Sequence, residues 1–435
     1  MATVQWVNHA SYVLSTDRFS LIADPWLFGS AFNNGWDLMS PTLFRVEDFD
    51  GIDYIWISHE HPDHFAPAVL KAIPAEIRAR ITVIFQDTRD KKVLGFCEKV
   101  GFRTMELSLT QPVSVDGRFT ATSGRTDDYD SWLLVEAEGC KVLNLNDCMV
   151  NSAAKAAAIR KRTGSVDLLL SQFGYAQWVG NPEDRELRRQ AAAEKMERLR
   201  YQTLALQPRF LIPFASFVYF SHEENAYLND HLGNVAQVVE FLQRETSAQP
   251  IVLYPGDRWE IGGPWSNTAA LQAYERDYRR EKSPLRTSPA VPEDELVKLG
   301  RNYVKRVCER NNVPLAILLE RVMPNALARH VRIRLWDLDR TVLFGLAEGL
   351  RFVDGDDPAD VEMGSDSLAY ILRFDWGMGT LEVNGRFRAS PLGKQKLLST
   401  FRLAGLNNFS DRFDLRHVLG RAVSKSRRLL SRAGA

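Results

Sequence analysis

One stretch of seven residues has the clearest capacity for chemistry. It reads Ser58-His59-Glu60-His61-Pro62-Asp63-His64 and gathers three of the eight histidines of the chain beside two carboxylates. Imidazole nitrogens and carboxylate oxygens are the usual ligands of Zn, Fe and Mn, and four such donors this close together can serve two ions. The alternative is a polar turn whose histidines are satisfied locally, but a turn has no need of three histidines. The stretch therefore predicts a metal site.

An apolar run directly before the motif indicates how it is positioned. Tyr54-Ile55-Trp56-Ile57 has the pattern of a buried strand, and the end of such a strand delivers side chains to a cleft. Strands and helices alternate along the first 260 residues, which predicts α/β layers. Strands are expected within 3–24 as a hairpin and over 80–85, 103–107, 166–171, 210–214 and 251–257, and helices over 66–73, 89–100 and 184–206.

At the histidine motif the sequence resembles the metallo-β-lactamase superfamily. The resemblance implies an α/β fold of the αββα sandwich type. It also implies that His59 and His61 hold one ion and that Asp63 and His64 hold the other. A second likeness lies upstream, where Trp6-Val7-Asn8-His9-Ala10, Asp24-Pro25-Trp26-Leu27 and Ala31-Phe32-Asn33-Asn34-Gly35-Trp36 are similar to the CMP-N-acetylneuraminate hydroxylases.

A dinuclear site needs ligands from outside the motif. Asp147 is the best candidate for a bridging carboxylate, because it follows a predicted strand and Leu143-Asn144-Leu145-Asn146-Asp147-Cys148 resembles the hydroxylases. The alternative is a turn aspartate that caps residues 149–160. His222 is the candidate final ligand by the same resemblance, with a substrate-binding or supporting role as its alternative. Asp63 and Asp147 are the residues we assign to catalysis.

The chain departs from the superfamily at its third ligand motif, where a histidine is expected. The segment reads Gly124-Arg125-Thr126-Asp127-Asp128-Tyr129-Asp130-Ser131 and places Thr126 at that position. Either a carboxylate, with Asp127 and Asp128 as the candidate metal ligands and Asp130 beside them, replaces the imidazole, or the first site is weakened. Additional oxygen donors would favour Fe or Mn over Zn.

Two further polar residues are expected to support the ligands. His9 follows the first strand in a run that many members of the superfamily share near the cleft, and Asp24 ends the second strand. We predict that both contact ligands rather than metal, with a hydrogen-bonded core histidine as the alternative for His9. The sequence cannot place Arg125, Tyr175 and Lys195, which are candidates for contact with a polar substrate.

The length of 435 residues predicts two domains. We expect a catalytic domain over 1–281, a linker rich in Pro, Ser and Thr over 282–294, and a smaller α+β domain over 295–435. The latter is predicted to begin with helix to about 327, to continue with three strands within 329–363, and to return to helix over 365–374. It resembles the sterol-carrier-protein-like fold, which can enclose an apolar ligand, although a structural or dimerising appendage with a filled core is the favoured interpretation.

The composition narrows the list of partners and locations. Lysine plus arginine equals aspartate plus glutamate at 55 each, so charge gives no indication of nucleic-acid binding. A signal peptide and an apolar stretch of membrane-spanning length are both missing, and a cytoplasmic location is expected. The basic tail from Leu415 predicts a terminal helix that docks or frays, with contact to an anionic membrane or an acidic partner as the alternative. The sequence does not indicate an oligomeric state.

The four scattered cysteines do not suggest a disulfide framework or a Cys-based cluster. The sequence also lacks the paired Cys-x-His and Cys-x-x-His ligands of a Rieske centre, which the animal hydroxylases carry. An oxygenase of this kind would therefore need an external electron-transfer protein as a partner.

Two enzyme hypotheses and one binding hypothesis follow. We favour a diiron oxygenase that hydroxylates a small polar substrate of the nucleotide or sugar type, which makes it an oxidoreductase and monooxygenase. The alternative is a hydrolase of an ester, lactone or phosphodiester, in which a metal-bridging hydroxide attacks. A binding protein that has lost its metal is the third, since the fold alone does not determine function. Iron is the favoured metal for the two ions, with Zn or Mn as alternatives.

Overall fold

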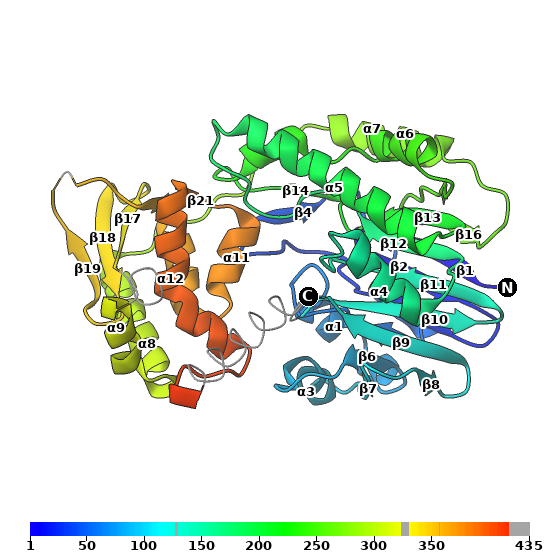
Figure 1. Ribbon diagram of the computed structural model, residues 1–435, viewed down its shortest axis with the longest axis horizontal. Helices are drawn as coiled ribbons and strands as arrows, with labels where there is room; N and C mark the ends of the chain where they lie inside the picture. Colours follow the sequence, from blue (N-terminus) through cyan, green and yellow to red (C-terminus); the bar gives the residue numbers. More distant parts are fainter. Residues whose placement is uncertain (127–128, 323–329, 356, 417–435) are drawn as a thin grey trace, which may run out of the picture. The chain divides into compact units, whose positions relative to one another are not determined.

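The computed structural model describes residues 1–126, 129–322, 330–355 and 357–416 (Figure 1). The chain divides into two compact units. The first consists of residues 1–176, 185–221 and 226–285, and the second of residues 177–184, 222–225 and 286–435. The predicted ligands Asp127 and Asp128 and the basic tail over 417–435 lie outside the described residues.

The first unit contains a seven-stranded sheet that carries the histidine motif. Its strands are, in spatial order, β16 (Arg258–Glu260), β1 (Thr3–Asn8), β2 (Ser11–Ser15), β3 (Ser20–Ala23), β5 (Tyr54–Trp56), β6 (Thr82–Gln86) and β7 (Arg103–Leu107). β1, β2 and β3 are antiparallel, as the predicted hairpin requires, whereas β3, β5, β6 and β7 run parallel. All three residues of β5 are buried, because the strand lies inside the sheet and is covered on both faces.

A second seven-stranded sheet faces the first. Its strands are β15 (Gln249–Pro250), β13 (Phe210–Phe214), β12 (Leu168–Gln172), β11 (Cys140–Asn144), β10 (Ser131–Ala137), β9 (Phe119–Arg125) and β8 (Val113–Val115). One apolar core draws residues from both sheets, among them Trp6 and Trp56 of the first and Trp132 and Leu169 of the second. A short ribbon of β4 (Trp36–Leu38) and β14 (Val218–Phe220) completes the unit.

Helices cover the outer faces of the two sheets. They are α1 (Pro67–Ala72), α2 (Ala75–Arg78), α3 (Lys92–Lys99), α4 (Ala153–Thr163), α5 (Arg185–Leu206), α6 (Val235–Glu245) and α7 (Thr268–Arg279), with short 3₁₀ helices over Val46–Gly51 and Ala226–His231. α3 packs on β6 and β7, while α5 packs on β12. Figure 1 shows α5, α6 and α7 on one side of the strands and α1 and α3 on the other. The predicted αββα sandwich is confirmed.

The strand predicted over 251–257 is wrong. Ile251, Val252 and Leu253 are buried and follow β15; the Ile251 N–H still donates to the Leu211 carbonyl of β13 at 2.8 Å, but no strand continues beyond Pro250. Side chains form hydrogen bonds with the backbone of Val252. Oδ1 of Asn267 accepts a bond from its N–H, and the Trp265 indole donates to its carbonyl. An apolar run with such partners is a buried loop, and the sequence pattern does not distinguish it from a strand.

The second unit has an α+β architecture around one sheet. The strand order is β19 (Gly349–Val353), β18 (Arg340–Gly345), β17 (Val331–Leu335), β20 (Val361–Met363) and β21 (Phe387–Ala389), so the region 329–363 holds four strands rather than the predicted three. The helices are α8 (Glu293–Arg310), α9 (Val313–Val322), α10 (Ser365–Arg373), α11 (Gly377–Asn384) and α12 (Pro391–Asn408). Phe344 and Phe401 stack in its core, and Tyr303 packs edge-on against both rings. Its likeness to the sterol-carrier-protein-like fold stays a prediction.

Two short segments of the second unit come from within the sequence of the first. Residues 177–184 contribute Trp178, whose ring stacks on Phe387 at 4.9 Å between centroids. Residues 222–225 contribute Glu224, which pairs with the fully buried Arg386 at 2.6 Å. A domain that begins at residue 295, as the sequence suggests, would omit these contacts.

The segment between α7 and α8 is expected to be the first site of limited proteolysis. Residues 281, 283 and 284 are exposed, and Ser283 and Pro284 lie outside any helix or strand. From residue 286 the chain is held, because Arg286 accepts a backbone bond from Glu223 and Val291 donates to Ser365. Cleavage by trypsin should therefore fall after Lys282. Mass spectrometry of early fragments tests this, and a resistant 280–285 segment with cleavage elsewhere would contradict it.

None of the helices in the described part of the chain combines the length and the apolar character needed to cross a bilayer.

Candidate metal centre

The candidate site forms where strand ends from both sheets meet. β3 and β5 are parallel neighbours, so Asp24 and Ser58, which follow them, lie at the same edge of the first sheet. β11 and β12 are parallel neighbours in the second sheet, and their ends carry Asp147 and Gln172. Carboxyl ends of parallel strands are the common position of functional side chains in α/β folds. His9 joins them from the turn between β1 and β2.

Three residues at the site adopt the left-handed backbone region, which is uncommon for residues other than glycine. The φ angles are +41° for His9, +42° for Asp24 and +51° for Asn146. Such conformations cost about 1–3 kcal/mol each and persist where surrounding contacts determine them. Each of the three lies directly after a strand or next to Asp147, so the local strain coincides with the polar site.

Asp24 is the buried centre of the supporting hydrogen bonds. Its carboxylate accepts from the backbone N–H of Ser58 and from the Ser58 hydroxyl, both at 2.7 Å. It also lies 2.9 Å from Nδ1 of His64 and accepts from the Asn146 amide at 3.3 Å. A carboxylate bonded to Nδ1 places the proton there and directs the lone pair of Nε2 away from it. Asp24 thus contacts His64, a candidate ligand, and its supporting role stays a prediction.

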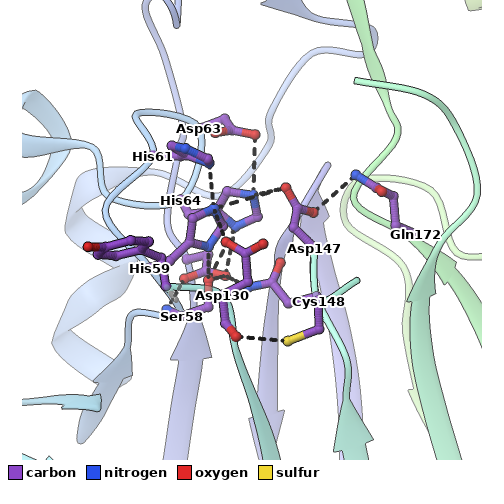
Figure 2. A network of polar contacts seen from close by, with 12 residues as sticks. Ser58, His59, His61, Asp63, His64, Asp130, Asp147, Cys148 and Gln172 are labelled. Carbon is purple, nitrogen blue, oxygen red and sulfur yellow. Dashed lines mark hydrogen bonds and ion pairs between the residues drawn. The ribbon is translucent and has the colours of Figure 1, made fainter. Parts of the chain in front are cut away.

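The potential metal ligands fall into two groups of three. His59, His61 and Asp147 form one group, and His9, Asp63 and His64 form the other; within each group the ligand atoms lie within 4.8 Å of one another. Figure 2 shows the rings of His59 and His64 and the carboxylates of Asp63 and Asp147 directed toward one another. The structure thus brings together all four histidine-motif candidates and Asp147.

Asp147 lies between the two groups. Its Oδ2 is 4.0 Å from Nε2 of His59 and 3.6 Å from Nε2 of His64. Its other oxygen, Oδ1, accepts a hydrogen bond from the Gln172 amide at 3.1 Å (Figure 2). Burial raises the pKa of Asp147, but the His64 and His59 rings lower it to about 2, so this side chain is an ionised carboxylate that faces both groups.

The second group has the spacing of ligands around one ion. Oδ2 of Asp63 lies 3.2 Å from Nε2 of His9 and 3.2 Å from Nε2 of His64. Two ligand atoms on a common ion, with bonds of about 2.1 Å, are separated by roughly this distance. We expected His9 to contact a ligand, and the structure places it in the ligand group itself.

Unpartnered buried atoms show that the residues fit a cation. Oδ1 of Asp63 and Nδ1 of His9 are buried and make no hydrogen bond, and Nε2 of His64 faces the carboxylates of Asp63 and Asp147 without forming one. Burying such atoms without a partner is costly, and metal coordination provides one. The charge balance agrees: burial lowers the pKa of His64, but Asp63, Asp24 and Asp147 raise it well above its usual value. The site therefore carries an excess of negative charge that metal ions would neutralise.

His59 has the properties of a neutral ligand. Burial, followed by the charges of His64 and His61, lowers its pKa well below the usual value. Ser58 contacts its Nδ1 at 2.9 Å, and its Nε2 lies 2.8 Å from Nδ1 of His61. The neutral imidazole is the form that binds metal, and the Ser58 hydroxyl fixes the orientation of the ring.

Asp130 is the described carboxylate of the third motif. Its Oδ1 lies 3.8 Å from Nε2 of His59, and its backbone carbonyl accepts a bond from the Cys148 thiol at 3.1 Å. The neighbouring Gln86 supports this segment by donating to the carbonyl oxygens of Ser58 and Tyr129.

The exposure of the site differs between its carboxylates and its histidines. The side chains of Asp130 and Asp147 are each 19% exposed, whereas those of His59 and His64 are 1% and 0% exposed. Asp130 and Asp147 therefore lie on a side of the site that solvent reaches.

His222 is not part of either ligand group. It lies in the second unit, where Nε2 contacts Ser288 at 3.2 Å and Nδ1 accepts from the Glu224 backbone at 3.2 Å. Burial and the charge of Arg386 lower its pKa to about 4. Its role as a final ligand stays a prediction.

The three proposed substrate contacts differ in their surroundings. The Tyr175 hydroxyl donates to the Leu228 carbonyl, and Arg125 contacts Gln86 and the Asp87 carbonyl.

Lys195 on α5 donates a hydrogen bond to Gln172, and the Gln172 amide donates in turn to Asp147. Sequence reasoning noted Gln172 only as the start of a loop after a buried strand. Its link to Asp147 depends on the register of β11 against β12.

Comparisons with known proteins agree with this architecture. Residues 3–193 match the model of a β-lactamase superfamily domain. The cytidine monophosphate-N-acetylneuraminic acid hydroxylase of Xenopus laevis is 28% identical over 262 residues, which cover 56% of this chain and 43% of that protein. The chain therefore spans less than half the length of this relative.

Two solved structures superpose on part of the chain. CmlA, a diiron β-hydroxylase from Streptomyces venezuelae, superposes with a TM-score of 0.43 and 17% identity over 60% of this chain and 54% of its own. An isothiocyanate hydrolase from Delia radicum gut bacteria superposes with a TM-score of 0.45 and 15% identity over 60% of this chain and 99% of its own.

Proposed function

Because residues 3–193 match the model of a β-lactamase superfamily domain, we propose that the chain is a dinuclear iron-dependent oxygenase. Its substrate is a small polar molecule of the nucleotide or sugar type. Bound iron would supply a redox centre for the activation of O₂. Electrons would come from an external electron-transfer protein, which is a partner we propose on the same basis.

The observation that carries the proposal is the high oxygen content of the ligand set. Asp147 faces both groups, Asp63 belongs to the second, and Asp130 lies 3.8 Å from His59 in the segment where the superfamily resemblance implies a histidine. Carboxylates favour iron or manganese over zinc relative to a set with a third imidazole. The 28% identity to the Xenopus hydroxylase supports the same class of reaction.

The residues of the chain would act by holding the ligands and limiting water. Asp24 and Ser58 orient His64 and His59, and Gln172 orients Asp147. His64 and Asp63 are nearly inaccessible to solvent, whereas Asp130 and Asp147 border the open side. Substrate bound on that side would displace water from the carboxylates and from the open metal positions. Asp63 and Asp147 are the catalytic residues in this proposal.

A metal-dependent hydrolase is the second candidate. It is favoured by the first ligand group, in which two imidazoles and one carboxylate, His59, His61 and Asp147, form a set that also suits zinc. Two zinc ions would polarise an ester, lactone or phosphodiester and activate water for attack. No exchange of electrons is needed in this case.

The metal itself discriminates between the two candidates. Protein purified aerobically from cells supplemented with both iron and zinc is expected to contain more iron than zinc and to show an absorption band that changes on reduction. Metal-free protein reloaded with Fe(II) should then consume O₂ with a reductant and substrate, while protein reloaded with Zn(II) should not. Elemental analysis, optical spectra and an oxygen electrode provide the measurements. Full activity of the zinc form under strict anaerobiosis would exclude the oxygenase and support the hydrolase.

A further inference from the structure

A lysine reaches the metal centre through one intervening side chain. Lys195 lies in the middle of α5, and its Nζ donates a hydrogen bond to Oε1 of Gln172 at the end of β12. The amide of Gln172 donates in turn to Oδ1 of Asp147 at 3.1 Å. The ammonium group is therefore two hydrogen bonds away from the carboxylate that faces both ligand groups.

The charge of Lys195 is not neutralised by a direct partner. Among the residues that the structure describes, Gln172 is the single hydrogen-bond acceptor of the Lys195 Nζ, and the Nζ forms no ion pair. An ammonium has three N–H donors, so two remain for another acceptor. The side chain is half-buried, and a charge in such a position costs free energy unless something compensates it.

A second cation lies next to Lys195. Arg198 follows it by three positions on α5, and residues at this spacing are neighbours on a helix surface. Burial and the charge of Arg198 lower the pKa of Lys195 to about 8. Nη1 of Arg198 contacts the Met149 sulfur at 3.2 Å, two residues beyond Asp147. Two like charges at this spacing are unfavourable by themselves, whereas an anion between them would be bound by both.

We infer that Lys195, together with Arg198, binds an anionic group of the substrate, a phosphate or a carboxylate, beside the metal pair. The inference rests on the proposed function in one respect, namely that the metal pair is the reaction centre. The charged group would lie on the open, carboxylate side of the site, where Asp147 is 19% exposed. Anchoring it there would place the neutral part of the substrate at the metals, and the Gln172 amide would keep Asp147 in position during binding.

Binding of simple anions to the metal-loaded protein tests the inference. Methyl phosphate and acetate are titrated separately into wild type, Lys195→Met and Lys161→Met, with calorimetry as the readout. Met preserves the length of the side chain and removes its charge, and Lys161 is an exposed control on α4. We expect Lys195→Met to weaken binding of one anion at least tenfold, because a charge-assisted hydrogen bond is lost, and Lys161→Met to leave it unchanged. Lys195→Arg should retain most of the affinity.

The outcomes separate the anion source and the alternatives. A loss confined to methyl phosphate identifies a phosphate group, and a loss confined to acetate identifies a carboxylate. Anions that bind the metals directly contribute equally in all variants and do not produce a difference. Unchanged binding of both anions in Lys195→Met would overturn the inference, as would a fall in metal content, which would assign Lys195 to support of Asp147. Neither result depends on whether iron or zinc is the active metal, so the oxygenase proposal is tested independently.

Discussion

Replacing Asp147 by asparagine is expected to abolish the dinuclear occupancy, with at most one metal ion retained per chain. The reason is the position of Oδ2, which faces Nε2 of His59 in one ligand group and Nε2 of His64 in the other. An amide is uncharged and one of its two terminal atoms is a donor, so it is a poor bridge between two cations. The carboxylate of Asp147 also supplies a negative charge, which the neutral imidazole ligands around it do not provide.

Asp130→Asn is the matched control for this experiment. Asp130 approaches only His59, at 3.8 Å, so its loss should weaken one position and leave the ion held by Asp63 and His64 in place. Elemental analysis of both variants, with circular dichroism to establish folding, gives the comparison. Two ions per chain in folded Asp147→Asn would remove Asp147 from the metal site.

Gly393→Ala is expected to destabilise the second unit strongly. Gly393 lies in the first turn of α12, where its N–H donates to the Ser390 hydroxyl. A Cβ at this position would lie 1.9 Å from the carbonyl oxygen of Asp360 and 2.9 Å from its carbonyl carbon. Both are backbone atoms directly before β20, so the clash cannot be relieved by a side-chain rotation and α12 must shift. We expect a loss of about 3 kcal/mol in the free energy of unfolding of this unit.

Gly405→Ala on the same helix is the control. No atom lies within 4 Å of a Cβ at this position, and alanine in a helix is favoured over glycine by about 0.5–1 kcal/mol. The two substitutions should therefore have opposite signs. Hydrogen–deuterium exchange of peptides from β17 and β18 measures the stability of this unit separately from the first. Equal protection in the two variants would contradict the packing argument.

The sequence predicted the parts of the site that depend on local pattern. The spacing of His59, His61 and His64 after an apolar strand, and the strand end before Asp147, can be recognised without tertiary information. The contacts of His9, Asp130 and Gln172 could not be derived in this way. They depend on which strands are neighbours and on their register, as with Asn144 opposite Leu170, which brings the ends of β11 and β12 together.

The prediction of the fold also succeeded where local pattern was enough and failed where distant contacts decide the structure. The αββα order follows from the alternation of strands and helices, but the buried loop over Ile251–Leu253 was mistaken for a strand because its hydrogen-bond partners are the distant side chains of Asn267 and Trp265. In the second unit, the sequence pattern merged four strands into three. An apolar sequence pattern indicates that a segment is buried. Burial alone does not specify which groups form hydrogen bonds with the backbone N–H and C=O groups of that segment.

The threading of residues 177–184 and 222–225 into the second unit means that the two units are not interchangeable modules. A fragment that starts after the α7–α8 segment would lack Glu224, so the fully buried Arg386 would lose its ion pair at 2.6 Å and keep the one with Asp366 at 3.1 Å. It would also lose Trp178 from Phe387 and the paired bonds between Asn181 and Ala389. Gene fusion or exchange at that segment would therefore transfer an incomplete unit, and a single cut there should yield two pieces that remain associated through the threaded residues.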